Sequence, residues 1–243
     1  MNRRELLFGI GFGWLPLFHR DSIVAAGIRF QVLRYGHSPR RYLFIHGDEP
    51  TAREVLTLTM QTHPGIAYLV TGNERNVALE GGKLDPNRMF SREGAAKNLK
   101  TLNPGWPPER IGRALDFLDR EREKLLRHLT PPKGGLLIAL HNNRDYSIQD
   151  EAPVSDEVSM REPDRPHEFF LCTDPRDFQV MAKSPYNVVL QHRKPPEDDG
   201  SLSRLAAQRG FRYLNLECGV GKFEAQIERL GWADRNLALR LGA

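Results

Sequence analysis

The chain has 243 residues, and a hydrophobic content of 40% is sufficient for one substantial core without a long linker or a repeat. The 35 lysines and arginines nearly balance the 31 acidic residues, and the net charge of +4 is too small to indicate a nucleic-acid-binding protein. The two cysteines, Cys172 and Cys218, do not have the spacing of a thiolate metal site, although a disulfide between them is compatible with an oxidising compartment.

The first 26 residues have the features of an export signal. Arg3 and Arg4 form a twin-arginine pair, and the apolar segment 6–18 follows them. Small residues stand where a signal peptidase reads, so we expect cleavage after Ala26. The apolar segment is too short to span a bilayer comfortably. We therefore predict an exported protein, periplasmic or extracellular, that uses the twin-arginine route and keeps no stable membrane span; the alternatives are an ordinary helix of a cytoplasmic protein and an uncleaved anchor.

The remaining residues, 27–243, are predicted to form a single catalytic domain of the α/β class. Short apolar runs alternate with helical periodicity, which favours a three-layer αβα arrangement with a central mixed sheet. Residues 142–185 are rich in proline and charge, and we expect an irregular segment that forms part of a pocket wall. The predicted strands are residues 28–35, 42–46, 66–71, 136–141, 187–191 and 211–217, and the predicted helices are residues 49–62, 108–129 and 202–209.

A histidine and a carboxylate stand three residues apart where the second of these strands ends. His46 and Glu49 follow the apolar run, and a helical pattern opens at Pro50. Ligands at strand ends of an α/β sheet converge on a crevice. The pair is half of a zinc site, although a His-x-x-Glu spacing alone also arises by chance.

A second histidine lies in a similar setting. The apolar run 136–140 ends at His141, so a buried strand again delivers a histidine to its carboxyl end. Two histidines and one glutamate with an open fourth position form a ligand set of catalytic zinc sites. The sequence therefore predicts a Zn²⁺ site made of His46, Glu49 and His141. The simpler alternative for His141 is a polar strand-end residue that bonds to nearby backbone.

Polar motifs between and after these residues make the pattern more specific. Gly72-Asn73 precedes Asp85-Pro86-Asn87-Arg88-Met89-Phe90, and a late strand ends at Glu217. The series His-x-x-Glu, Gly-Asn, Asp-x-Asn-Arg-x-Phe, strand-end His and late Glu resembles the zinc carboxypeptidase superfamily. Within it, the similarity is greatest to the succinylglutamate desuccinylase/aspartoacylase-like branch. It extends from about residue 42 to about residue 219.

This resemblance implies a role for each matching residue. Glu217 would be the general base that takes a proton from the attacking water and delivers it to the leaving amine. Asn87 and Arg88 would hold a substrate carboxylate, which suits a planar guanidinium fork. Asp85 would accept the remaining N–H of His46. Without the resemblance, these residues are also compatible with a turn, a surface arginine and an ion-paired glutamate.

The sequence departs from the branch at the arginine that stabilises the oxyanion of the reaction. Glu80 occupies the ungapped position, and we take Arg75 as the candidate, with Lys83 as the near alternative. The side chains that select the substrate are not identified by the motifs either. The candidates for that role are Arg144, Tyr146, Tyr186 and Arg204.

The motifs together predict a zinc-dependent hydrolase that cleaves an amide bond next to a free carboxylate. The enzyme would be a metallo-carboxypeptidase or an N-acyl amino acid deacylase, and its partner a small-molecule or peptide substrate, with a cell-wall peptide a reasonable choice for an exported protein. The alternative is a catalytically silent protein that keeps the fold and binds peptide carboxylates through Arg88. A serine hydrolase is disfavoured because the Gly-x-Ser-x-Gly elbow is missing from the sequence.

Overall fold

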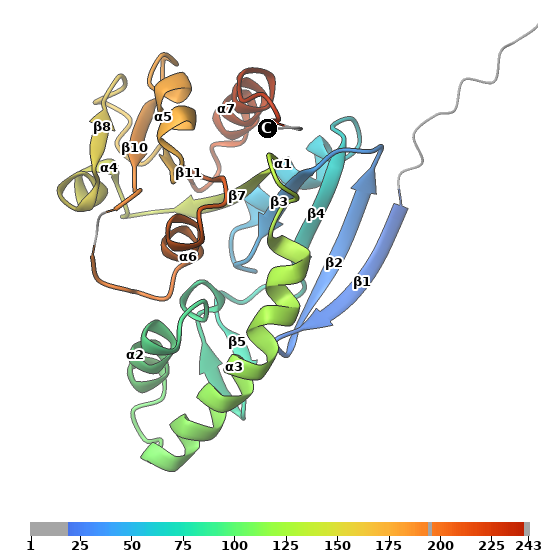
Figure 1. Ribbon diagram of the computed structural model, residues 1–243, viewed down its shortest axis with the longest axis vertical. Coiled ribbons are helices and arrows are strands. Elements are labelled where there is room, and N and C mark those ends of the chain that lie inside the picture. Colours follow the sequence, from blue (N-terminus) through green and yellow to red (C-terminus); the bar gives the residue numbers. More distant parts are fainter. Residues whose placement is uncertain (1–18, 194–195, 241–243) are drawn as a thin grey trace, which may run out of the picture.

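The computed structural model describes residues 19–193 and 196–240 (Figure 1). Within these residues, nine strands form one mixed sheet around which the protein is built. These strands are β1 (His19–Ala25), β2 (Ile28–Tyr35), β3 (Arg40–Phe44), β4 (Gly65–Val70), β7 (Leu136–Asn143), β8 (Glu157–Ser159), β9 (Phe169–Cys172), β10 (Asn187–Leu190) and β11 (Tyr213–Gly219). A separate hairpin consists of β5 (Val77–Leu79) and β6 (Gly82–Leu84).

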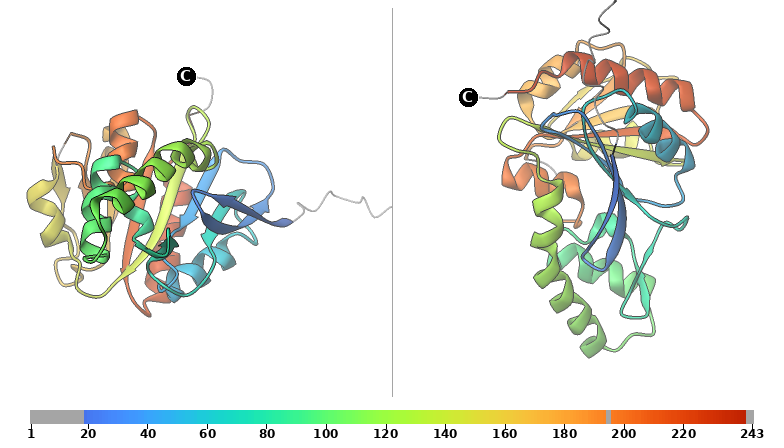
Figure 2. Two further views of the ribbon diagram at one scale, coloured as in Figure 1. Left: turned by 90° about the horizontal axis from the view of Figure 1, so that it is seen from below. Right: turned by 90° about the vertical axis from the view of Figure 1, so that its right-hand side faces the viewer.

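Helices cover both faces of the sheet (Figure 2). They are α1 (Pro50–Thr59), α2 (Arg92–Leu102), α3 (Pro108–Leu129), α4 (Ile148–Glu151), α5 (Pro175–Met181), α6 (Leu202–Arg209) and α7 (Phe223–Asn236), with short 3₁₀ turns η1 (Pro86–Arg88) and η2 (Ala152–Val154). Helices α1 and α7 contact each other on one face, and α3 and α6 lie on the other. The predicted α/β class with a central mixed sheet is confirmed.

The strand order is β1-β2-β4-β3-β7-β11-β9-β10-β8. At its centre, β4, β3, β7 and β11 run parallel to one another. Antiparallel pairing begins on either side of them, at β2 and at β9. The carboxyl ends of the central strands therefore lie along one edge of the sheet, where His46, His141 and Glu217 are found.

Local sequence signals explain the helix boundaries that the predictions reproduced. Pro50 and Pro108 occupy the first turns of α1 and α3, where proline costs no hydrogen bond. Ser201 caps α6 by accepting from the backbone N–H of Arg204, and Gly210 ends that helix with a φ of 69°. The leucine side chains of α3 are buried, among them Leu115, Leu118 and Leu125.

The predicted elements are all present, and their bounds shift by at most three residues. Strand β2 and helices α3 and α6 have the predicted bounds. Helix α1 ends at Thr59 rather than residue 62, and β11 begins at Tyr213 rather than residue 211. The elements that were not predicted are β1, the β5–β6 hairpin, η1, α2, α4, η2, β8, β9 and α5.

The last residues of the predicted leader form a strand, and the leader itself stays a prediction. Residues His19–Ala25 form β1, which pairs along its full length with β2. Ala26 and Gly27 make the connecting turn with φ values of 51° and 75°, as a two-residue hairpin loop requires. The expected cleavage position thus lies inside a hairpin, and residues 1–18 lie outside the described residues. Among the described helices, none has the length and apolar character needed to cross a bilayer.

The segment 142–185 is more regular than expected. It contributes two strands to the sheet, β8 and β9, and two helices, α4 and α5. All four side chains of β9 are buried, because this strand lies between β11 and β10. The expected irregularity is wrong for this strand and for α5, since the prolines of the segment stand between elements or, as Pro175 does, at a helix start.

Both cysteines are buried free thiols, so the possible Cys172–Cys218 disulfide is not formed in this structure. On the paired strands β9 and β11, Cys172 lies opposite Leu214, four positions away from Cys218. Burial raises the pKa of both thiols well above the ordinary value, which is the behaviour of packing residues.

Candidate metal centre and active site

Three adjacent parallel strands bring the predicted ligands to one edge of the sheet. His46 and Glu49 lie in the loop between β3 and α1, and His141 lies near the carboxyl end of β7. On the neighbouring strand β11, Glu217 stands directly opposite His141 in the register. His46 and His141, which are 95 positions apart in the chain, therefore meet in one place.

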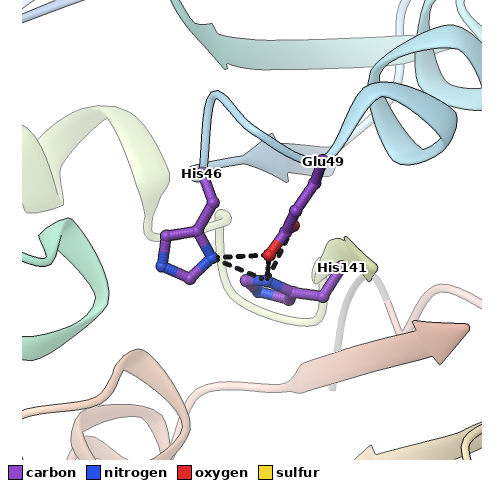
Figure 3. Close-up of side chains that lie close together, drawn as sticks. All are labelled: His46, Glu49 and His141. Carbon is purple, nitrogen blue, oxygen red and sulfur yellow. Dashed lines mark hydrogen bonds and ion pairs between the residues drawn. The ribbon is translucent and has the colours of Figure 1, made fainter. Parts of the chain in front are cut away.

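The side chains of His46, Glu49 and His141 converge as Figure 3 shows. His46 Nδ1 lies 2.8 Å from Glu49 Oε1 and 3.2 Å from His141 Nδ1. His141 Nδ1 lies 3.2 Å from Glu49 Oε2. All three residues are buried, with at most 4% of their surface exposed. The structure thus brings together the three residues predicted as metal ligands.

The geometry and chemistry of this group fit a metal ion. Zinc bonded at about 2.0–2.1 Å by tetrahedral ligands keeps its donor atoms about 3.3 Å apart, close to the separation of the two ring nitrogens. Glu49 Oε2 is buried and accepts no hydrogen bond. Two imidazole nitrogens and one carboxylate form a zinc ligand set, and the fold brings all three to one point.

Asp85 holds the other side of the first histidine. Its Oδ1 accepts from His46 Nε2 at 2.9 Å and also from the backbone N–H of Asn87. The second bond caps η1, so the turn fixes the carboxylate. A proton on Nε2 leaves Nδ1 of His46 as the nitrogen that faces Glu49 and His141.

Charge compensation points to a cation at the same position. Burial alone would lower the pKa of His46, but hydrogen bonds to Asp85 and Glu49 raise it to about 9. Burial opposes ionisation of Glu49, yet both histidines hold its pKa at about 2. At neutral pH and without a metal, an imidazolium therefore lies between two carboxylates. A metal ion in place of its proton compensates the same negative charge.

The predicted arginines and Asn87 lie around this group. Arg75 is half exposed and its guanidinium lies 3.4 Å from both Glu49 and Asp85. Arg88 lines the cavity in front of the ligands and forms an ion pair with Asp199 at 3.4 Å. Asn87 Oδ1 accepts from the backbone N–H of Leu202, joining η1 to the start of α6.

Glu217 is braced by two amides that the sequence reasoning missed. Asn215 Nδ2 donates to its Oε1, and Asn143 Nδ2 donates to its Oε2, each at 3.0 Å. Asn143 stands two positions after His141, and Asn215 two before Glu217, so these side chains share one sheet face. The spacing of two residues from His141 and from Glu217 is the sequence signal that could have identified Asn143 and Asn215.

One cavity of about 510 Å³ contains these groups. Its wall also includes Glu151 at the end of α4, a residue without a motif or spacing signal in the sequence. Of the four candidates for substrate selection, Arg144 and Tyr146 line the cavity. Tyr186 packs against Phe170 and Trp232, and Arg204 is buried in α6.

Comparisons with known proteins return solved structures only. No family model and no curated protein matches the chain. A succinylglutamate desuccinylase from Silicibacter sp. TM1040 is 15% identical, with 86% of this chain and 59% of that chain covered, at a TM-score of 0.48. A succinylglutamate desuccinylase/aspartoacylase from Rhodobacter sphaeroides is 13% identical, with 91% and 65% covered, at a TM-score of 0.47. The chain thus spans about three fifths of their length, and both bear the name of the branch that its motifs resemble.

Proposed function

We propose that this protein is a zinc-dependent hydrolase that cleaves an amide bond next to a free carboxylate. The observation that carries the proposal is the convergence of His46, Glu49 and His141, with the carboxylate of Glu217 on the adjacent strand facing the same cavity. A metal-binding group alone is compatible with a structural site. A buried, amide-braced carboxylate beside it supplies a proton acceptor as well.

The residues divide the work of hydrolysis among them. Zinc, when bound by the three ligands, supplies water activation near neutral pH and polarisation of the carbonyl. Glu217 receives the proton of the attacking water and delivers it to the leaving nitrogen, while Asn143 and Asn215 fix the direction of its carboxylate. Arg75 reaches the edge of the site and would stabilise the developing negative charge on the oxygen.

Substrate orientation would depend on Arg88 and Asn87. Arg88 offers a guanidinium fork to a substrate carboxylate, as either a C-terminal carboxylate or that of an N-acyl amino acid requires. Its present partner, Asp199, is half exposed, so this ion pair is weak and exchangeable. A carboxypeptidase and a deacylase remain the two forms of this activity that the site fits.

The metal content of the purified protein tests the proposal first. We expect about one zinc ion per chain by elemental mass spectrometry, and none in His141→Ala. His37→Ala removes an exposed histidine outside the site and should keep the metal. A zinc-free wild-type protein after reloading, or equal zinc in His141→Ala, would overturn the assignment.

A second candidate function is a carboxylate-binding protein without turnover. It is favoured by one observation, the contacts of Arg75 with Glu49 and Asp85, which draw its guanidinium toward carboxylates rather than a substrate oxygen. Glu217→Gln separates the two functions. An enzyme should keep zinc and lose most hydrolysis of N-acyl amino acids and peptides in this variant, whereas a binding protein shows no hydrolysis even in the wild type.

A further inference from the structure

Glu151 is a cavity-lining carboxylate to which the proposed mechanism gives no role. It is the last residue of α4, whose start is fixed by a capping box between Ser147 and Asp150. Its side chain reaches the cavity that holds the metal-binding residues, Arg88 and Glu217. The short helix therefore places a second acidic group in front of the site.

Both oxygens of this carboxylate are held in place. Oε1 accepts from the Tyr146 hydroxyl, and Oε2 accepts from Nε2 of the buried Gln191. A carboxylate has about four acceptor positions, so two donors leave capacity for a ligand. Tyr146 itself packs on Phe169, which fixes the direction of the hydroxyl.

No cation of the described residues is paired with Glu151, although Arg75, Arg88 and Arg144 line the same cavity. Within the part of the chain that the structure describes, no lysine, arginine or histidine forms an ion pair with it, and Arg88 pairs with Asp199 instead. Burial first, and then the charges of Asp199 and Glu217, raise the pKa of Glu151 to about 7, against the opposing effects of Arg88 and Gln191. Charges removed from water are ordinarily paired, and this partly buried carboxylate has no cation of its own in the described chain.

The side-chain amide of Asn215, in the same cavity, has an oxygen without a hydrogen-bond donor among the described residues. Asn215 is 92% buried and lines the cavity, and its Oδ1 accepts no hydrogen bond, whereas its Nδ2 is used by Glu217. A buried acceptor without a donor is energetically unfavourable. Carboxylates and a free amide oxygen together require a ligand that brings N–H donors and positive charge.

We propose that Glu151 forms a subsite for an ammonium group, so that the substrate carries a cationic amino group in addition to the carboxylate held by Arg88. The inference rests on the proposed function, because it places this ammonium in the amino acid that the amide cleavage releases. Lysine-like amino acids with a second amino group are the class that fits. Such a cation also competes with Arg88 for Asp199 and frees the guanidinium for the carboxylate.

Binding of L-lysine and L-norleucine tests the subsite without turnover. The two amino acids differ in the terminal ammonium group, and calorimetry at pH 8 on the zinc-loaded protein should give about 10- to 100-fold tighter binding of lysine. Glu151→Gln should remove this preference, because a glutamine still bonds to Tyr146 and Gln191 but has no charge. Glu157→Gln, an exposed residue of β8, is the matched control and should keep it.

Equal binding of both amino acids by the wild type, or an unchanged preference in Glu151→Gln, would overturn the subsite. If that variant does not fold, the wild type at pH 5.5 takes its place, since protonation of Glu151 should weaken the preference for lysine. Hydrolysis is assayed separately on N-acetyl-lysine and N-acetyl-norleucine. A lysine preference in binding without hydrolysis of either compound keeps the subsite and refutes the deacylase form of the proposed function for acetyl groups.

Discussion

The two ring nitrogens of His46 have different partners, and the carboxylate of Asp85 determines which nitrogen faces Glu49 and His141. Nε2 donates to Asp85 at 2.9 Å, and Nδ1 faces Glu49 and His141. A histidine without such a partner can present either nitrogen as donor, and it can also rotate. The partner therefore contributes to metal affinity although it does not touch the metal position.

Asp85→Ala should weaken zinc binding by about 10- to 100-fold. The variant loses the acceptor of the Nε2 proton and the carboxylate charge next to the site, while the three ligands remain. Affinity is measured by competition with a chromophoric chelator. Asp116→Asn, which changes an exposed carboxylate on α3, is the control. Unchanged affinity in Asp85→Ala would show that packing alone orients His46.

Glu151→Gln should raise the stability of the folded protein above neutral pH. The pKa of Glu151 is raised from 4.5 to about 7, so the folded state holds this proton more tightly than the unfolded state does. Its stabilising contribution is therefore present below about pH 4.5 and is lost as pH rises through 7. This difference in pKa corresponds to at most about 3 kcal/mol in the free energy of unfolding, and contact of the carboxyl with water reduces the amount.

Urea unfolding of the wild type and Glu151→Gln at pH 5 and pH 8 checks this sign. The variant should be more stable than the wild type at pH 8 and close to it at pH 5. A variant that is less stable at both values would mean that the hydrogen bonds from Tyr146 and Gln191, rather than the buried charge, dominate the energy at this position.

Much of the site could be predicted because its residues follow strand ends in a recognisable order. His46, Glu49, Asp85, His141 and Glu217 were all selected from the sequence; four of them line one cavity, and Asp85 contacts His46. Asn143, Asn215 and Glu151 were not selected. Their importance comes from pairing between β7 and β11 and from the fold of α4, which are contacts that local spacing does not encode.

At the scale of elements, those with a local sequence pattern were predicted, and those that depend on contacts with distant segments were missed. Helix α3 and strand β2 carry long periodic patterns, and their bounds were predicted correctly. Strand β9 has four residues in a proline-rich segment, and its extended form depends on the neighbours β10 and β11. Helix α2 was not predicted because it has few large apolar side chains and belongs to a polar stretch of the sequence.

Arg229 joins the missed segment to the carboxyl-terminal helix. This residue of α7 is fully buried, and its Nη2 lies 2.5 Å from Glu162 and 2.8 Å from Glu168. The guanidinium also lies 4.7 Å from the ring centre of Tyr186. The loop that leads into β9 is thus fixed by one cation on a distant helix.

Arg229→Met should destabilise the protein by about 3–5 kcal/mol, because buried Glu168 would keep only the exposed Arg165, at 3.9 Å, as a partner. Chemical denaturation measures the loss. Arg165→Met is the matched control, since this exposed arginine pairs with the same two carboxylates, Glu162 and Glu168, and should cost less than about 1 kcal/mol. Recovery of stability in Arg229→Met/Glu168→Gln would confirm the unpaired charge as the cause; a similar small loss in both single variants would contradict the account.

Strand β1 gives an element-scale test of the predicted leader. A chain that begins at Gly27 lacks β1, so the backbone groups of β2 that bond to it would face solvent. Compared with a chain that begins at His19, we expect lower stability in urea and self-association in sedimentation velocity. The zinc content should be equal, because β3, β7 and β11 are intact. Equal stability and a monomer would instead make cleavage after Ala26 compatible with the fold.

At the scale of the whole molecule, one continuous apolar core connects the sheet with a lobe formed by residues 77–102. This lobe contains β5, β6, η1 and α2 and carries Asp85 and Arg88. Leu84, Phe90 and Leu99 of that lobe belong to the same buried cluster as Leu43 of β3 and Leu140 of β7. The three candidate metal ligands come from β7 and from the loop that follows β3, and the partner of His46 comes from the lobe. The apolar core and the candidate metal site therefore both connect the sheet with the lobe.

This linkage predicts one cooperative unfolding transition that zinc moves as a whole. A ligand present at 100 times its dissociation constant stabilises the folded state by about 2.7 kcal/mol, which for a chain of this size raises Tm by about 5 to 10 °C. Calorimetry with and without zinc measures both quantities, and His141→Ala should keep the single transition but lose the shift. Two separate transitions, with only one of them sensitive to zinc, would show that the lobe folds independently of the sheet and would refute the single catalytic domain.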